Sequence, residues 1–227
     1  MNNKTKSKSQ NIIELLRNNY GNPSQNHSFK PFYWCLDGGG KELIKDTIVS
    51  KNISVMLEVG VFFGGSTKQW LDASSELMVI GIDPFPKLVN YLKNNIHIYE
   101  KHIEFKELNY KSLIEQLGKP EGSYFSVMSN LQEYGDRFFP IKGTSPDKLY
   151  ELKNIGITPE LIYIDSDKKM DELEVCHQLF PDCIISGDDW TWHKEEGYPI
   201  RKPIEEFAQK YDYEVISSRA TWLLKKN

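Results

Sequence analysis

Four aspartates in two short segments are the residues best suited to chemistry in this sequence. Asp165 and Asp167 follow one apolar run, and Asp188 and Asp189 follow another. If the two runs form neighbouring strands, the four carboxylates converge, and like charges packed together resist ionisation unless a cation offsets them. Ligands that are all oxygen suit Mg²⁺, Mn²⁺ or Ca²⁺ rather than zinc. We therefore expect Asp165, Asp188 and Asp189 to be metal ligands, the alternative being that Asp188 and Asp189 only cap a loop.

A glycine-rich loop follows an earlier apolar run. Gly60 allows a sharp turn, and Gly64 and Gly65 allow the backbone to approach a ligand, with Ser66 at the start of the next helix. The spacing is G-x-x-x-G-G-S rather than the G-x-G-x-x-G that suits a dinucleotide pyrophosphate. An acid such as Glu58 beside the loop suits the sulfonium of S-adenosylmethionine (SAM), although a glycine turn occurs in many strand–helix units.

Asp83 ends the next apolar run and is a candidate for binding a nucleoside. A carboxylate at this place can accept hydrogen bonds from both ribose hydroxyls, as in folds that bind NAD. The residue therefore indicates adenosine without deciding the cofactor. The alternative is that Asp83 caps a helix before Pro84.

The elements that must position these residues alternate between strand and helix. Continuous apolar runs predict strands buried on both faces of a parallel sheet, at Val55–Val59, Met78–Ile82, Phe138–Ile141, Leu161–Ile164 and Cys183–Ser186. Amphipathic patterns predict helices at 11–20, 41–50, 67–74, 126–134, 146–154, 170–180 and 202–211. Two final strands, Tyr213–Ser217 and Thr221–Leu224, predict a closing hairpin. The fold class is α/β, with a seven-stranded, mostly parallel sheet and an antiparallel C-terminal hairpin.

Two parts of the chain are additional to the strands and helices that a minimal fold of this kind needs. Residues 1–50 are expected to be a polar tail and a helical extension or lid before a main domain at 51–227. Residues 86–123 are expected to be an insertion, because one helix would suffice between the second and third strands. Helices are expected within it at 88–99 and 111–117.

Composition excludes several classes of protein. The net charge of −4 gives no basic footprint for nucleic acid. Three scattered cysteines, Cys35, Cys176 and Cys183, fit a reducing compartment. The sequence shows no signal peptide and no apolar stretch long enough for a membrane span. We expect a cytoplasmic protein without nucleic-acid or membrane partners.

Several segments together resemble a known family. The loop at 58–66, the D-x-D of 161–167, the G-D-D of 184–189 and the helix at 201–208 are similar to those of metal-dependent class I O-methyltransferases of the methyltransferase-24 and macrocin O-methyltransferase type. The resemblance runs from Trp34 to the C-terminus, apart from the insertion. It implies a Rossmann-like methyltransferase fold, with SAM and Mg²⁺ as cofactors.

The resemblance also implies roles for individual residues. Cofactor contacts would come from Glu58, Gly60, Gly64 and Ser66 on the methionine part, Asp83 on ribose and Ser145 near adenine, with Asp165 beside them. Mg²⁺ would be held by Asp165, Asp188 and Asp189. Asp167 would be the general base.

Alternatives for the base remain open. The family often has a histidine and an aromatic residue where this chain has Lys168 and Met170. Lys168 stands where the similar catechol O-methyltransferases carry a lysine base, and a lysine beside a metal can have a lowered pKa. His193 is a third candidate, as base or substrate contact. Aromatic residues that can line an acceptor pocket are Trp190, Trp192, Tyr198, Tyr33 and Trp34.

These observations predict methyl transfer to a hydroxyl of a small molecule, such as a sugar or a natural-product precursor. A homo-oligomer is possible. Competing hypotheses are a SAM-binding protein without methyl transfer, a metal-independent methyltransferase and, with less support, an NAD-dependent dehydrogenase.

Overall fold

A seven-stranded sheet forms the centre of the computed structural model, which describes residues 8–26, 28–32, 40–99, 107–166 and 170–227. Its strands are β1 (Val55–Val59), β2 (Met78–Asp83), β3 (Phe138–Lys142), β4 (Leu161–Ile164), β5 (Ile184–Gly187), β6 (Tyr213–Ser218) and β7 (Thr221–Lys226). The order is β3-β2-β1-β4-β5-β7-β6, in which β7 runs antiparallel to both neighbours. The predicted fold class is confirmed, and β4 and β5 are neighbours as the aspartate argument required.

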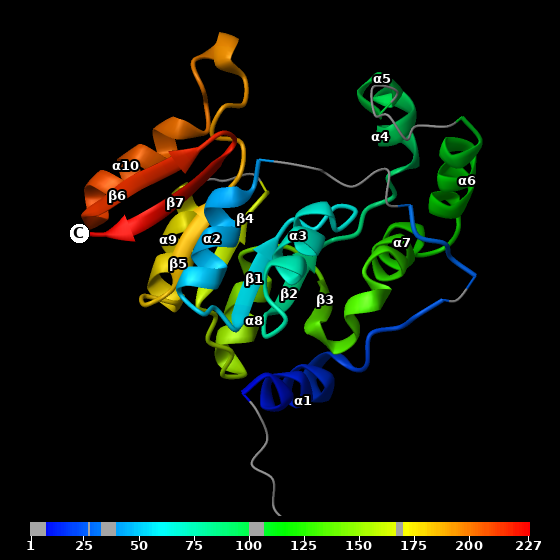
Figure 1. Cartoon of the computed structure of the whole chain (residues 1–227), viewed down its shortest axis with the longest axis horizontal. Helices are drawn as coiled ribbons and strands as arrows, with labels where there is room; N and C mark the ends of the chain where they lie inside the picture. Colours follow the sequence, from blue (N-terminus) through cyan, green and yellow to red (C-terminus); the bar gives the residue numbers. More distant parts are fainter. Residues whose placement is uncertain (1–7, 27, 33–39, 100–106, 167–169) are drawn as a thin grey trace, which may run out of the picture.

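Helices cover both faces of the sheet (Figure 1). One face packs against α1 (Lys8–Tyr20), α8 (Asp147–Asn154), α9 (Met170–Leu179) and α10 (Arg201–Tyr211). The other packs against α2 (Glu42–Ser50), α3 (Gly65–Ala73) and α7 (Gly122–Asn130). β1 and β2 are buried along their whole length, which explains why their sequences are continuous apolar runs rather than alternations. Among the described residues, no helix combines the length and apolar character needed to cross a membrane.

The segment between β2 and β3 departs from the predicted helices. The expected helix at 88–99 is two short helices, α4 (Val89–Asn94) and α5 (Ile96–Tyr99), and the one at 111–117 lies within α6 (Glu107–Gly118). The helix predicted at 126–134 instead begins at Gly122 and ends at Asn130, and the 3₁₀ helix η2 (Gln132–Arg137) follows. The apolar pattern continues past Asn130 into η2, where Gly135 has φ +53° and ψ −128°, a conformation outside the helical region.

Asn130 joins this segment to Phe32, which precedes α2, and to the glycine loop. Its Oδ1 accepts the Phe32 N–H at 2.7 Å, and its Nδ2 donates to the Phe63 carbonyl at 3.0 Å. Around this link an apolar cluster packs side chains from all three parts of the chain, namely Phe32, Phe63, Leu88, Leu92, Tyr110, Leu113 and Leu117. The glycine loop is therefore supported from outside by residues far away in sequence.

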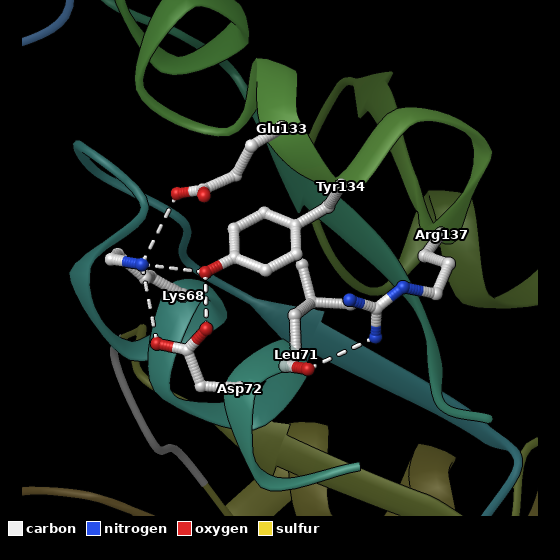
Figure 2. A network of polar contacts seen from close by, with 6 residues as sticks. All are labelled: Lys68, Leu71, Asp72, Glu133, Tyr134 and Arg137. Carbon is white, nitrogen blue, oxygen red and sulfur yellow. Dashed lines mark hydrogen bonds and ion pairs between the residues drawn. The ribbon is translucent and has the colours of Figure 1, made fainter. Parts of the chain in front are cut away.

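A polar network fastens α3 to η2 (Figure 2). The Lys68 ammonium donates to the Tyr134 hydroxyl at 2.6 Å and to Asp72 and Glu133 at 3.2 Å, while Tyr134 donates to Asp72 at 2.5 Å. Arg137 donates to the carbonyls of Leu71 and Ser74 at the end of α3. These bonds satisfy carbonyls that a helix end leaves without partners, and they fix α3 against the segment before β3.

Gly187, the last residue of β5, allows a close approach of backbone and ring. A Cβ atom at this position would lie 2.5 Å from the Ile164 carbonyl oxygen and 2.5 Å from Cζ2 of Trp222. Trp222 is itself fully buried and donates its indole N–H to the Asp188 carbonyl at 2.9 Å. The glycine before the paired aspartates is thus required by packing.

We expect Gly187→Ala to destabilise the protein by about 1–3 kcal/mol, because neither the strand backbone nor the buried indole can move freely. Urea unfolding monitored by circular dichroism measures this. The matched control is Gly118→Ala at the end of α6, where a Cβ meets nothing within 4 Å. Equal stability of the two variants would contradict the packing argument.

Candidate functional site

The glycine loop after β1 lies against the end of β4. Gly60 has φ +91°, and a Cβ there would lie 2.3 Å from the Asp165 carbonyl oxygen. Its N–H donates to Ile82 at 2.9 Å, so the loop is held between β2 and β4. Gly64, with φ +83°, caps the start of α3, and the half-buried Ser66 is the second residue of that helix. The loop therefore needs glycine at Gly60 and Gly64, two of the three positions that the sequence singled out.

Asp83 at the end of β2 holds the same loop. Its Oδ2 accepts the N–H groups of Val61 and Phe62 at 2.9 and 3.0 Å, and its Oδ1 accepts the Phe85 N–H at 2.6 Å. The side chain is 7% exposed. In this structure the carboxylate binds backbone amides of the loop, and its binding of ribose stays a prediction.

Glu58 is buried between β1 and α3. Its carboxyl group accepts hydrogen bonds from the Thr67 hydroxyl and, at 3.1 Å, from the Trp70 indole N–H. Burial raises the pKa of Glu58 to about 8, against the lowering effect of these two bonds. A contact with the methionine part of SAM stays a prediction, since the side chain faces α3 here.

A cavity of about 460 Å³ opens at the carboxyl ends of β1, β2, β3 and β4, within the size range of small-molecule sites. Its lining includes Gly60, Ser145, Ser166, Asp171 and Glu172. The Ser145 hydroxyl oxygen is buried and has no hydrogen-bond partner within the described part of the chain. A buried polar atom without a partner is costly unless a ligand satisfies it, so this cavity fits a polar ligand. The carboxyl groups of Asp171 and Glu172 in its lining favour one that also carries positive charge.

Three predicted metal ligands come together at the ends of β4 and β5. Asp165, Asp188 and Asp189 each offer a carboxylate oxygen, and these oxygens lie within 4.8 Å of one another. Oδ1 of Asp188 is buried and has no hydrogen-bond partner among the described residues, which is what a metal ligand requires. The oxygen donors and their number therefore fit a hard divalent cation.

Lys41 is a neighbour of this cluster that the sequence did not reveal. Its ammonium forms an ion pair with Oδ2 of Asp188 and donates to the Tyr163 hydroxyl at 2.9 Å. Asp171 and Glu172, which line the cavity, were also missed. Both lie in the first turn of α9, where acids are usual for helix stability alone.

Of the remaining candidate bases and aromatic residues, the structure describes only some. Asp167 and Lys168, the two bases considered first, lie outside the described residues, as do Tyr33 and Trp34. His193 lies between β5 and α10, with Nδ1 3.2 and 3.1 Å from Glu195 and Glu196.

The aromatic residues beside His193 differ in their surroundings. Trp190 and Tyr198 stack on Arg201, with its guanidinium 4.9 and 3.7 Å from their ring centres. Trp192 is 51% exposed. Their part in an acceptor pocket stays a prediction.

Comparison with solved structures identifies the fold. An O-methyltransferase from Bacillus cereus in complex with SAH superposes with a TM-score of 0.54 at 15% identity, covering 98% of this chain and 92% of that one. The O-methyltransferase TomG from Streptomyces achromogenes, involved in tomaymycin synthesis and in complex with SAM, gives 0.53 at 12% identity, covering 98% and 92%. SAH-bound methyltransferase PaMTH1 from Podospora anserina gives 0.51 at 11% identity, covering 100% of each chain.

These likenesses show a Rossmann-like methyltransferase fold and, at such identities, the fold alone. No family model matches the sequence, and no curated protein matches it.

We expect Glu58→Gln to change how stability depends on pH. Because burial raises the pKa of Glu58 from 4.5 to about 8, the folded state binds more protons than the unfolded chain between these values. The contribution of Glu58 to stability is then fully present below pH 4.5 and is lost as pH rises through this window, by up to about 1.4 kcal/mol per pH unit. Glutamine does not titrate and removes this slope.

Urea unfolding from pH 5 to pH 8.5 measures the two profiles, with Glu76→Gln, an exposed acid, as control. Parallel profiles for wild type and Glu58→Gln would show that Glu58 keeps an ordinary pKa.

Proposed function

We propose that this protein is a SAM-dependent O-methyltransferase acting on a hydroxyl of a small molecule, with a divalent metal ion. The observation that carries the proposal is the contact between Gly60 and Asp165, which joins the cavity beside the glycine loop to the aspartate cluster. A donor and an acceptor site that share one border are what group transfer needs. Solved structures of the same fold include O-methyltransferases with SAM or SAH bound.

The cavity is the proposed cofactor site. Gly60 allows the ligand to approach the loop backbone, and Ser145 offers its buried hydroxyl. The carboxylates of Asp171 and Glu172 suit the positive charges of SAM better than the phosphates of a dinucleotide. This charge pattern also disfavours an NAD-dependent dehydrogenase.

Asp165, Asp188 and Asp189 would hold the metal ion. When bound, it would supply a positive charge that lowers the pKa of the acceptor hydroxyl. The residues of the protein would align the acceptor oxygen with the methyl carbon of SAM and would take the proton of the acceptor hydroxyl. Asp167, Lys168 and His193 are the proposed bases. The new O–C bond forms as the C–S bond breaks, the sulfonium becoming the neutral thioether of SAH.

The acceptor side is proposed to lie over β4 and β5, toward Trp190, Trp192 and Tyr198. Aromatic faces suit a sugar ring or a flat natural-product precursor. Residues 51–227 would form the methyltransferase domain and residues 1–50 its extension. A chain that binds SAM but transfers no methyl group to any hydroxyl acceptor would instead be a binding protein of this fold.

We expect SAM and SAH to bind and NAD not to bind. Isothermal titration measures binding directly, and SAM at 100 times its Kd should stabilise the folded state by about 2.7 kcal/mol. Gly60→Ala should abolish SAM binding, because its Cβ would displace the Asp165 backbone. Binding of NAD without binding of SAM would make the glycine loop a dinucleotide site.

We expect Asp189→Asn to weaken Mn²⁺ binding by about tenfold or more and to lower methyl transfer equally, because it removes a charged ligand. Asparagine tolerates the φ of +66° at this position. Mn²⁺ titration followed by electron paramagnetic resonance measures the first, and transfer of labelled methyl from SAM to a panel of hydroxylated acceptors the second.

The matched control is Asp212→Asn, an aspartate with φ +57° at the end of α10. Methyl transfer that survives both chelation and Asp189→Asn would point to a metal-independent enzyme.

A further inference from the structure

Lys41 is a charged residue in a place that disfavours it. Its side chain is 1% exposed, so the ammonium has lost its water. It is also the residue that caps the N-terminus of α2, where the helix dipole repels positive charge. A buried ammonium is tolerated only when it is paired and hydrogen-bonded. The contacts of Lys41 must therefore explain its presence.

Those contacts lead to Asp188. The ammonium forms an ion pair with Oδ2 of Asp188, donates to the Tyr163 hydroxyl at 2.9 Å and lies 5.4 Å from the centre of the Tyr163 ring. The backbone of Lys41 is fixed as well, since its carbonyl accepts the N–H groups of Ile44 and Lys45. The lysine is thus a rigid support from α2 to the end of β5.

The other polar groups of Asp188 also form hydrogen bonds, with one exception. Its N–H donates to the Ile164 carbonyl at 3.2 Å, and its carbonyl accepts the Trp222 indole N–H at 2.9 Å. With Oδ2 held by Lys41, the buried Oδ1 is the one atom without a hydrogen-bond partner within the described part of the chain. The same side chain has an oxygen in the cluster with Asp165 and Asp189.

We propose that Lys41 is a positioning residue of the metal site: it holds Oδ2 of Asp188 so that Oδ1 is presented to the cation between Asp165 and Asp189. This inference rests on the proposed function, because it assigns the aspartates to a cation. Lys41 does not touch substrate or cofactor in this role. It acts through the orientation of one ligand, as hydrogen-bonded partners of metal ligands do.

Two effects of Lys41 on a nearby cation oppose each other. Its charge repels the cation, whereas its bond to Oδ2 fixes the ligand. The ion pair with Asp188 already offsets most of the lysine's charge, while loss of the bond frees a carboxylate that nothing else in the described structure orients through Oδ2. We therefore expect the loss of ligand orientation to outweigh the relief of charge repulsion when Lys41 is replaced.

The test compares Mn²⁺ binding by wild type and Lys41→Met, which keeps the length of the side chain and removes its charge. We expect Lys41→Met to weaken Mn²⁺ binding by about tenfold or more. Lys45→Met, a half-buried lysine one turn along α2, should bind Mn²⁺ as wild type does. SAM binding, measured on the same samples, reports that each variant is folded.

A double-mutant cycle separates positioning from a general structural role. In an Asp188→Asn background, Lys41→Met should have no further effect on Mn²⁺ binding, because the lysine acts through that carboxylate. If Lys41→Met does not fold, Tyr163→Phe offers a milder change. It removes only the hydroxyl that accepts a hydrogen bond from the Lys41 ammonium, and it should weaken Mn²⁺ binding about two- to threefold.

Unchanged or tighter Mn²⁺ binding by Lys41→Met, with wild type binding Mn²⁺, would overturn the role of Lys41 and leave the proposed metal site intact. Additive effects in the cycle would also overturn it. Failure of the wild type to bind Mn²⁺ would overturn both proposals, while SAM binding would still test the cofactor site separately.

Discussion

Among the described residues, four carboxylates and one ammonium lie close together where β1, β4 and β5 meet α2, namely those of Glu58, Asp165, Asp188, Asp189 and Lys41. Glu58 is fully buried, and its pKa is raised chiefly by burial and further by Asp165, while Lys41 acts in the opposite direction. Carboxylates packed together in a partly buried space resist ionisation unless positive charge offsets them. This grouping of charges is the constraint on which the surrounding structure depends. It explains why the chain places a lysine at a helix N-terminus, and why one oxygen of Asp188 is left for another partner.

The shape of this region is maintained by residues outside it. Asp83 holds the glycine loop from β2, and Asn130 holds it from the segment before β3. The Lys68 and Tyr134 network fixes α3, which carries the rest of the loop (Figure 2). Phe32, before α2, and the segment between β2 and β3 therefore help to support the site. Their packing on Phe63 gives a physical reason for the length of the β2–β3 connection.

The sequence predicted the strands well, because a strand buried on both faces must be a continuous apolar run. It also predicted that the aspartates converge, since topology alone brings the carboxyl ends of neighbouring parallel strands to one edge. The helix at 126–134 was displaced because the apolar pattern continues from α7, which ends at Asn130, into the 3₁₀ helix η2. The binding of ribose by Asp83 stays a prediction, whereas its hydrogen bonds to the loop amides could not be foreseen, because only the folded structure positions those amides. Lys41 was missed because its partner Asp188 is 147 residues away, and a lysine after three glycines has the appearance of a solvated one.

The carboxyl edge of the sheet has two parts that differ in chemistry. Over β1, β2 and β3 lies a cavity with a buried hydroxyl and two helix-terminal carboxylates, suited to an organic cation. Over β4 and β5 lie the aspartates, suited to a hard metal ion. The parts meet where Gly60 touches the Asp165 backbone, so that even a methyl group added at Gly60 would push them apart. A sulfonium bound in the first part and an alkoxide-like oxygen in the second would carry opposite charges across this border. Under the proposed function, their attraction would draw the acceptor oxygen toward the methyl group, while the in-line alignment would come from how the two sites hold their ligands.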